Sequence, residues 1–109
     1  MPGPRHTIAV HDGRQISAAR VLAGLTVADL AKAAGTTTRT ISRLEVGGAV
    51  HVAASKRHGH VEQSLWQRIV RALEDHGVEL VPENGERGAG TRWVRPRAKR
   101  QGEPDRASE

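Results

Sequence analysis

The sequence has no cysteine, phenylalanine or tyrosine and only two tryptophans among its 109 residues. The lack of cysteine excludes disulfide bonds, thiolate metal sites and cysteine catalysis. With so few aromatic rings, the stacking platforms of single-strand nucleic-acid binders are largely missing. The hydrophobic core must therefore consist of Ile, Leu, Val and Ala, and we expect Trp66 and Trp93 to be packing residues.

Long apolar runs are also missing. No stretch approaches the roughly 20 apolar residues that span a bilayer, and residues 1–11 lack the apolar centre of a signal peptide. No glycine-rich phosphate loop joins a strand to a helix, and no Ser or His stands in a recognised nucleophile setting. We therefore expect a soluble, cytoplasmic protein that needs no cofactor, contacts no membrane and is not an enzyme.

Positive charge is plentiful and uneven. The chain has 17 Lys or Arg against 12 Asp or Glu, which gives a net charge of +5. Residues 1–60 carry eight basic and three acidic residues, so the positive charge is concentrated in the first half of the chain. Such a balance is typical of a small protein that binds a polyanion, most often nucleic acid.

Helix caps and apolar periodicity predict four helices. A capping box at Asp12 and Gln15 marks the start of the first helix. A second box, at Thr26 and Asp29, marks the start of the next helix, and Thr37 caps the third. Apolar residues recur at helical spacing after each of these signals and again after residue 61. The predicted helices span residues 13–23, 27–34, 38–46 and about 62–76.

The spacing between the second and third helices is the most specific signal in the chain. Two helices that cross closely need a small residue at the crossing, which Ala31 supplies. The turn between them needs a residue that accepts positive φ, which Gly35 supplies. The third helix needs inward apolar residues three apart, and Ile41 and Leu44 meet this requirement. Residues 27–46 therefore predict a helix-turn-helix.

The segment at residues 25–47, LTVADLAKAAGTTTRTISRLEVG, resembles the helix-turn-helix of the XRE family, which includes the lambda-repressor and Cro-like regulators. The resemblance extends over about residues 13–76, and the later segment RALEDHGVELVPENG is similar to the ending of short bacterial members. It implies a mainly α, lambda-repressor-like domain of four to five helices. Residues 78–81 and 91–95 have strand character around a Gly- and Pro-containing segment, so we expect a C-terminal β-hairpin after that domain.

The chain is accordingly divided into four parts. We expect a flexible N-terminal arm over residues 1–11 and the helix-turn-helix domain over residues 12–77. A β-hairpin extension follows over residues 78–95, and residues 96–109 form a disordered tail. Residues 49–60 carry no clear pattern and are the longest uncertain stretch.

The resemblance implies that the third helix enters the major groove with its first residues facing the bases. The expected DNA-facing residues of this helix are Thr38, Arg39, Thr40 and Arg43. Arg39 and Arg43 are the best candidates for base readers, because a guanidinium matches the O6 and N7 acceptors of guanine. Thr37 fits a helix cap better than a base reader.

The resemblance also implies two supporting sets of residues. Arg20 and Glu45 match a family pair that forms a buried, structural ion pair. The family often has Gln where this chain has Val27, so Thr26 is the expected phosphate contact at that helix start. The segment after the third helix is longer than is usual in the family, and it carries Lys56 and Arg57. For these two residues, contact with the DNA backbone and simple exposure to solvent are equally favoured interpretations.

Metal binding is not expected. His51, His58 and His60 lie in this same basic segment, but no carboxylate or cysteine joins them at a spacing suited to a metal ion.

These observations predict a sequence-specific DNA-binding transcriptional regulator that binds double-stranded DNA as a homodimer. Between repressor and activator, we favour a repressor. The hairpin or the fourth helix is the expected dimer interface. Two alternatives stay open: an antitoxin that binds its own promoter and also holds a toxin, and a protein-interaction module that has lost DNA binding. A general nucleic-acid binder is a weaker third. The operator, the regulated genes and any effector are not encoded in a recognisable pattern.

Overall fold

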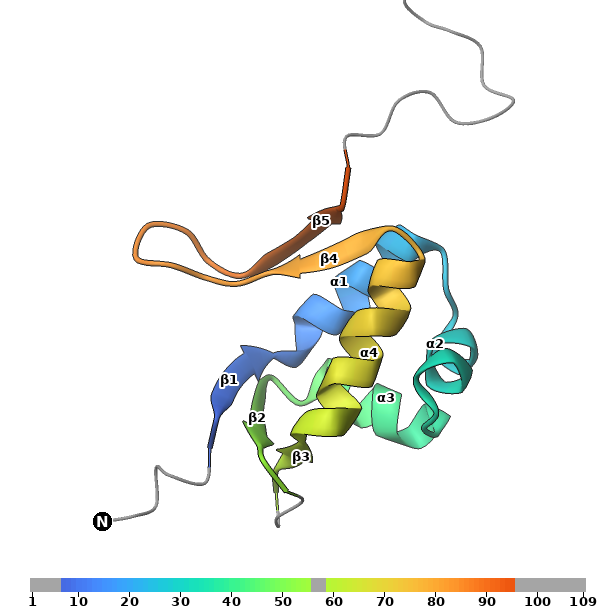
Figure 1. Ribbon diagram of the computed structural model, residues 1–109, viewed down its shortest axis with the longest axis horizontal. Helices are drawn as coiled ribbons and strands as arrows, with labels where there is room; N and C mark the ends of the chain where they lie inside the picture. Colours follow the sequence, from blue (N-terminus) through green and yellow to red (C-terminus); the bar gives the residue numbers. More distant parts are fainter. Residues whose placement is uncertain (1–6, 56–58, 96–109) are drawn as a thin grey trace, which may run out of the picture.

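The structure is a computed structural model that describes residues 7–55 and 59–95. Within these residues the chain forms four helices and five strands (Figure 1). Their bounds, in chain order, are β1 Ala9–Asp12, α1 Gly13–Ala23, α2 Val27–Ala34, α3 Thr38–Val46, β2 Ala49–Ala53, β3 Val61–Glu62, α4 Gln63–Asp75, β4 Val78–Val81 and β5 Gly90–Trp93. The fold is a helix-turn-helix domain of mainly α structure with short strands around it.

The core is aliphatic and joins all four helices. Its fully buried large side chains come from one stripe of each helix and from β2 and β4, as the periodicity requires. They are Ile16, Leu30, Ile41, Val52, Ile69, Leu73 and Val78. Burial of these stripes against one another is the main stabilising contribution, because each fully buried aliphatic side chain contributes about 1.5 to 3 kcal/mol.

The start of α1 depends on a close approach between two backbones. Asp12 is the N-cap, as predicted, and its carboxylate accepts a hydrogen bond from the Arg14 backbone N–H at 2.9 Å. The residue after the cap is Gly13, where an added Cβ would lie 1.7 Å from the Leu44 carbonyl oxygen. Only glycine therefore lets α1 cross α3 at this distance.

Gln15 does not complete the capping box predicted from Asp12. Its side chain is buried and points away from the cap. The Gln15 amide donates to the carbonyl oxygens of Val81 at 3.0 Å and Gly90 at 2.7 Å. The capping-box prediction was wrong because the amide reaches carbonyls on two strands that are distant in sequence.

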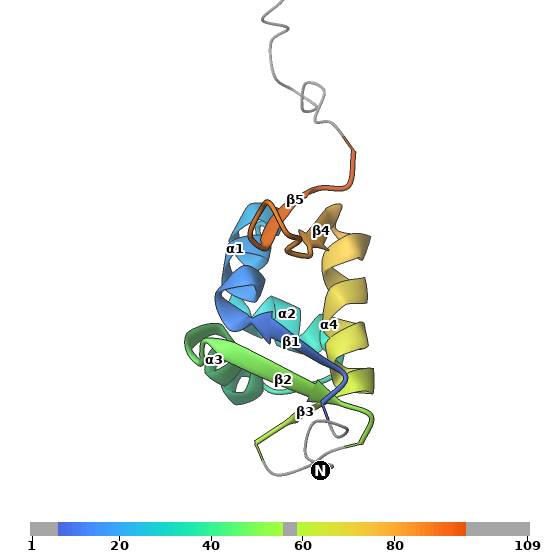
Figure 2. The same ribbon diagram turned by 90° about the vertical axis from the view of Figure 1, so that its left-hand side faces the viewer.

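A three-stranded sheet covers one side of the helices, in the order β1-β2-β3 (Figure 2). β1 pairs antiparallel with β2, and β2 pairs in parallel with β3. The structure differs here from the flexible arm predicted for residues 1–11, because residues 9–11 belong to β1. Residues 49–60, which carry no clear pattern in the sequence, contain β2.

β4 and β5 pair antiparallel, with Val78 opposite Trp93 and Val81 opposite Gly90. This two-stranded sheet lies against α1 and α4. Val78 is fully buried, and the Trp93 ring lies 3.7 Å from the position of a Cβ on Gly77. Trp66 packs elsewhere, stacked on His11 with ring centroids 4.3 Å apart. Both tryptophans thus lie in packed surroundings.

Several predicted features fall outside the described residues. These are the tail at residues 96–109, the first six residues, and the basic segment Lys56, Arg57 and His58. None of the helices in the part of the chain that the structure describes is long and apolar enough to cross a membrane.

Candidate nucleic-acid interface

The turn between α2 and α3 has the geometry that the sequence predicted. Gly35 ends α2 in the left-handed region, with φ of 69°. The Thr36 N–H donates to the Ala31 carbonyl at 2.9 Å, which reverses the chain before α3 begins. Ala31 is 3% exposed, on the face of α2 that packs into the core. The buried small residue and the left-handed glycine that the pattern required are therefore both present.

Thr37 is the N-cap of α3. Its hydroxyl oxygen accepts a hydrogen bond from the Thr40 backbone N–H at 3.1 Å, and the hydroxyls of Thr37 and Thr40 are 3.0 Å apart. These contacts confirm the capping role predicted for Thr37. They also hold the Thr40 side chain over the first turn of α3, where it is half-buried.

One stripe of α3 faces solvent. Arg39 and Val46 are seven residues apart, which is close to two helical turns, and Ser42 and Arg43 lie between them on the same side. All four side chains are exposed, whereas Ile41, Leu44 and Glu45 on the opposite side are buried. Among the described residues, no side chain pairs with either guanidinium of this stripe. The stripe thus presents two cations to solvent from a helix whose other face is anchored in the core.

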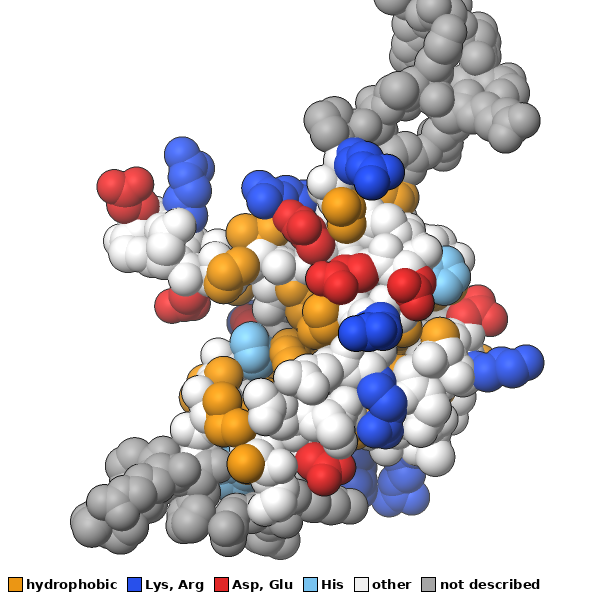
Figure 3. Space-filling model, in the orientation of Figure 1, with side chains coloured by type: hydrophobic (Ala, Val, Ile, Leu, Met, Phe, Trp, Pro, Cys, Tyr) orange, Lys and Arg blue, Asp and Glu red, His pale blue; other side chains and the backbone are white. Residues whose placement is uncertain are grey.

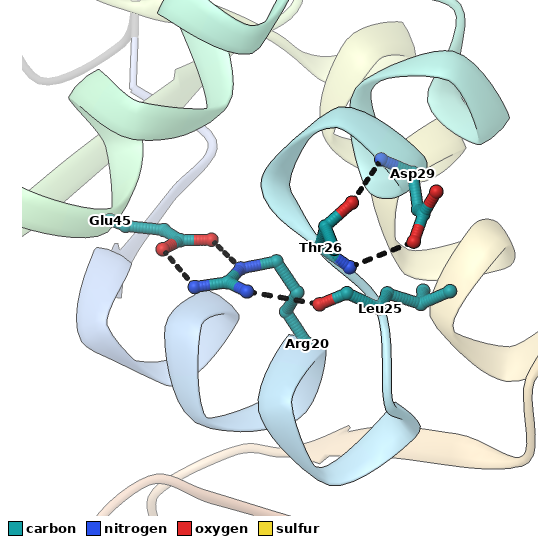
Figure 4. Close-up of polar contacts among 5 residues, drawn as sticks. All are labelled: Arg20, Leu25, Thr26, Asp29 and Glu45. Carbon is teal, nitrogen blue, oxygen red and sulfur yellow. Dashed lines mark hydrogen bonds and ion pairs between the residues drawn. The ribbon is translucent and has the colours of Figure 1, made fainter.

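Arg20 and Glu45 join α1 to α3, as expected from the resemblance (Figure 4). The guanidinium donates to both carboxylate oxygens of Glu45, at 2.7 and 3.1 Å, and to the Leu25 carbonyl at 2.9 Å. The two side chains are 17% and 9% exposed. Hydrogen bonding to Glu45 raises the pKa of Arg20 above its ordinary value. This pair fixes the end of α3 and thereby the direction of its outer stripe.

Thr26 forms a capping box with Asp29 at the start of α2 (Figure 4). Its hydroxyl oxygen accepts from the Asp29 N–H, and its N–H donates to the Asp29 carboxylate, both at 3.0 Å. The hydrogen bond from the Thr26 N–H lowers the pKa of Asp29, so a negative charge already sits at the start of α2. A phosphate at this helix start could still accept from the Thr26 hydroxyl and from the first backbone N–H groups of α2, which an α-helix does not use internally.

A cavity of about 680 Å³ lies between α3 and the N-terminal part of α4. Its polar lining includes Thr36, Thr40, Arg43, His60 and Arg68. The Arg68 Nε donates to the Ala34 carbonyl at 2.8 Å, which places this guanidinium beside the helix-turn-helix turn. The cavity therefore brings a second arginine next to Arg43.

Basic side chains gather toward the helix-turn-helix on the face that shows α4 (Figure 3). Lys and Arg side chains line the lower right of this view, toward α2 and α3, with one acidic group at the lower centre, and acidic side chains form a band across the middle with further basic side chains above it. The basic side includes the helix-turn-helix, which agrees with the positive balance of the first half of the sequence.

Sequence reasoning missed Ser42, Val46 and Arg68. Helical periodicity alone places Ser42 and Val46 on the stripe of Arg39 and Arg43, so this signal was available. Arg68 had no such signal, because only the packing of α4 against α2 brings it to the turn.

The histidines form no metal site in the part of the chain that is described, where no cluster of three metal-ligating side chains occurs. His51 and His60 meet edge to face, with ring centroids 5.7 Å apart, and a ring nitrogen of His60 lies 3.0 Å from the Thr7 hydroxyl oxygen.

Comparison with known proteins agrees with this geometry. Residues 16–52, from α1 to β2, match the family described as helix-turn-helix. No curated protein matches the chain. The matched segment contains the buried crossing, the turn and the whole of α3, and the members of this family are DNA-binding regulators. The resemblance noted in the sequence is confirmed over residues 16–52, and this match supports an XRE-like, DNA-binding helix-turn-helix regulator.

Proposed function

We propose that this protein is a sequence-specific repressor that reads the major groove with α3 and blocks a promoter by occupying it. The observation that carries the proposal is the outer stripe of α3, where Arg39 and Arg43 are exposed while the opposite face is buried. Each guanidinium has the geometry to donate two hydrogen bonds to guanine. We therefore expect guanines at two positions of each half-site.

In this proposal the residues near Arg39 and Arg43 contact the sugar-phosphate backbone of the DNA. Thr38 is exposed at the first turn of α3 and contacts a base or a phosphate, with Thr37 and Thr40 beside it. Thr26 offers its hydroxyl to a phosphate at the start of α2. Lys56 and Arg57, outside the described residues, add charge after α3. Arg68 offers a further phosphate contact. Such contacts give affinity and register without reading sequence.

One domain of this size reads only a few base pairs. We therefore propose that a homodimer binds two inverted half-sites whose centres lie about one helical turn apart. Binding at such a site excludes RNA polymerase when the site overlaps the promoter.

Fluorescence anisotropy tests the proposal on the DNA upstream of the protein's own gene. The full chain is titrated against this duplex and against a scrambled duplex of equal composition, at two salt concentrations. We expect a preference of roughly a thousandfold for the native duplex. The Arg39→Ala/Arg43→Ala double variant removes the proposed base contacts and loses most of that preference.

The matched control is Arg71→Ala/Arg92→Ala, which removes the same charge from exposed positions on α4 and β5. We expect this variant to keep the preference while losing a little affinity for both duplexes. Equal binding of both duplexes by the wild type, retained by the α3 variant, contradicts the proposal. It leaves the interaction-module alternative standing.

A further inference from the structure

The outer edge of β1 is open. β1 pairs only with β2 among the described strands, so its other edge carries backbone groups that no described strand covers. Edge strands of this kind pair readily with another chain unless Lys, Pro or a bulge blocks them. Residues 7–11 contain no Pro and no Lys, Arg, Asp or Glu. Asp12, at the end of the strand, is already paired with Arg14 at 2.7 Å.

Exposed apolar side chains lie on this strand and directly before it. Val10 of β1 is 56% exposed, and Ile8, which precedes β1 and donates its N–H to the Val52 carbonyl, is 50% exposed. They are two of the five large hydrophobic side chains that are exposed in the described part of the chain. Val10 and Ala49 line a cleft of about 470 Å³ that reaches Pro82 and Ala89 at the base of the β4–β5 loop. Figure 3 shows hydrophobic atoms on this side of the molecule, below the β4–β5 loop. Figure 2 looks directly onto β1 and β2, and no described helix lies in front of them.

Two other described faces, which the sequence favoured as the dimer interface, are charged. The outer side of α4 carries Arg71 and Glu74, both exposed. The outer side of the β4–β5 sheet carries an ion pair between Arg92 and Glu79 at 2.6 Å. An uncharged edge offers nothing to an acidic or a basic partner. It does suit a copy of itself, because antiparallel pairing of β1 with β1 places no like charges opposite each other.

We infer that two copies of this chain associate through β1, paired antiparallel across a two-fold axis. An antiparallel pair of identical strands is self-complementary, as a two-fold interface requires. The result is one continuous sheet in the order β3-β2-β1-β1-β2-β3. β2 follows α3 after only Gly47 and Gly48, so this pairing also sets the direction of the two α3 helices. The inference rests on the proposed function, because a palindromic operator needs two copies of the chain. The β1 edge then takes the place of the hairpin and α4 as the expected dimer interface.

Single-cysteine cross-linking tests the contact directly, because the chain has no cysteine of its own. Ile8→Cys and Val10→Cys are each oxidised mildly in the full chain. Val21→Cys is the control, since Val21 is 65% exposed on α1, away from this edge. We expect a disulfide-linked dimer from at least one of the Ile8→Cys and Val10→Cys variants and only background from the control. Equal cross-linking of all three variants overturns the inference.

Sedimentation velocity gives the second readout. We expect the wild type to dimerise at micromolar concentration. Val10→Lys places two charges at the two-fold interface and weakens dimerisation roughly tenfold or more, whereas Val21→Lys leaves it unchanged. Circular dichroism melts check that both variants are folded. A wild type that stays monomeric at tens of micromolar overturns the inference, as does a dimer that Val10→Lys leaves intact.

The two proposals fail in different ways. If the protein dimerises through β1 but shows no preference for its own upstream DNA, the proposed function is wrong and this interface stands. If it binds that DNA specifically as a dimer that Val10→Lys does not weaken, the function stands and this interface is wrong.

Discussion

Arg20 and Glu45 form a two-point ion pair, with the guanidinium Nε 2.7 Å and Nη2 3.1 Å from the two carboxylate oxygens. The pair links α1 to the end of α3 and is mostly buried. A single substitution leaves the other charge with little water and without its oppositely charged partner, which is costly in a protein interior.

Removing one side of this pair is expected to destabilise the protein more than removing both. Glu45→Ala should lower the free energy of unfolding by about 2 to 3 kcal/mol. Arg20→Met/Glu45→Leu replaces both charges by apolar side chains of similar size and should recover much of this loss. Urea denaturation measures all variants. Additive losses in the double variant would show that the two residues act independently.

Gly13→Ala should be strongly destabilising although alanine favours helices. The new Cβ would lie 1.7 Å from the Leu44 carbonyl oxygen, so α1 and α3 must separate. We expect a reduction of about 3 kcal/mol in the free energy of unfolding, typical of overpacking. Gly85→Ala is the control, because no described atom lies within 4 Å of its Cβ position, and thermal unfolding should show little change. A stable Gly13→Ala variant would contradict the close crossing.

Gln15→Leu should loosen the β4–β5 sheet from α1. The substitution removes donors to the Val81 and Gly90 carbonyls and leaves both without that partner. We expect the free energy of unfolding to fall by about 2 kcal/mol, because two carbonyl acceptors lose a hydrogen-bond donor. Hydrogen exchange of the β4 and β5 amides should accelerate more than that of α2. Uniform acceleration would instead mean a global loss of stability.

Stability is expected to decrease below neutral pH in part through His11. Burial against Trp66 lowers the pKa of His11 below its ordinary value of 6.5. The unfolded chain then binds a proton more readily than the folded one, so the free energy of unfolding falls as the pH drops through about 6.5. His11→Phe keeps a ring against Trp66 and should flatten this dependence between pH 7 and 5.

Asp29 contributes in a separate pH range. Its pKa is lowered, so its stabilisation is present above its ordinary value of 3.8 and is lost as the pH falls through the folded value. The two titrations are therefore distinguishable in one pH series.

Arg68→Gln separates phosphate binding from base reading. We expect equal reductions of affinity for native and scrambled DNA, and a shallower dependence of log affinity on log salt, by about 0.9 for each phosphate that the variant no longer neutralises. Arg39→Ala should weaken native DNA more than scrambled DNA. Anisotropy titrations over a salt series measure both. A selective effect of Arg68→Gln on native DNA would place this arginine among the base readers.

The helices and their ends were determined by the sequence itself. Thr26 with Asp29, Thr37 and Gly35 act through hydrogen bonds and backbone angles within about four residues. Such signals do not depend on the rest of the fold, so they predicted α2, the turn and the start of α3. The resemblance to the XRE family then implied that Arg39 and Arg43 face outward, and both side chains are exposed.

Only the tertiary structure decided which distant groups meet. The Gln15 amide bonds to a carbonyl 75 positions away, and β1 becomes a strand because β2, after α3, lies beside it. Arg68 reaches the turn only because α4 packs against α2. These contacts come from the burial of apolar faces, which is non-directional and leaves no short-range pattern in the chain. Local hydrogen bonding therefore determined where α3 begins, whereas packing decided how α3 is anchored and which edge remains open among the described strands.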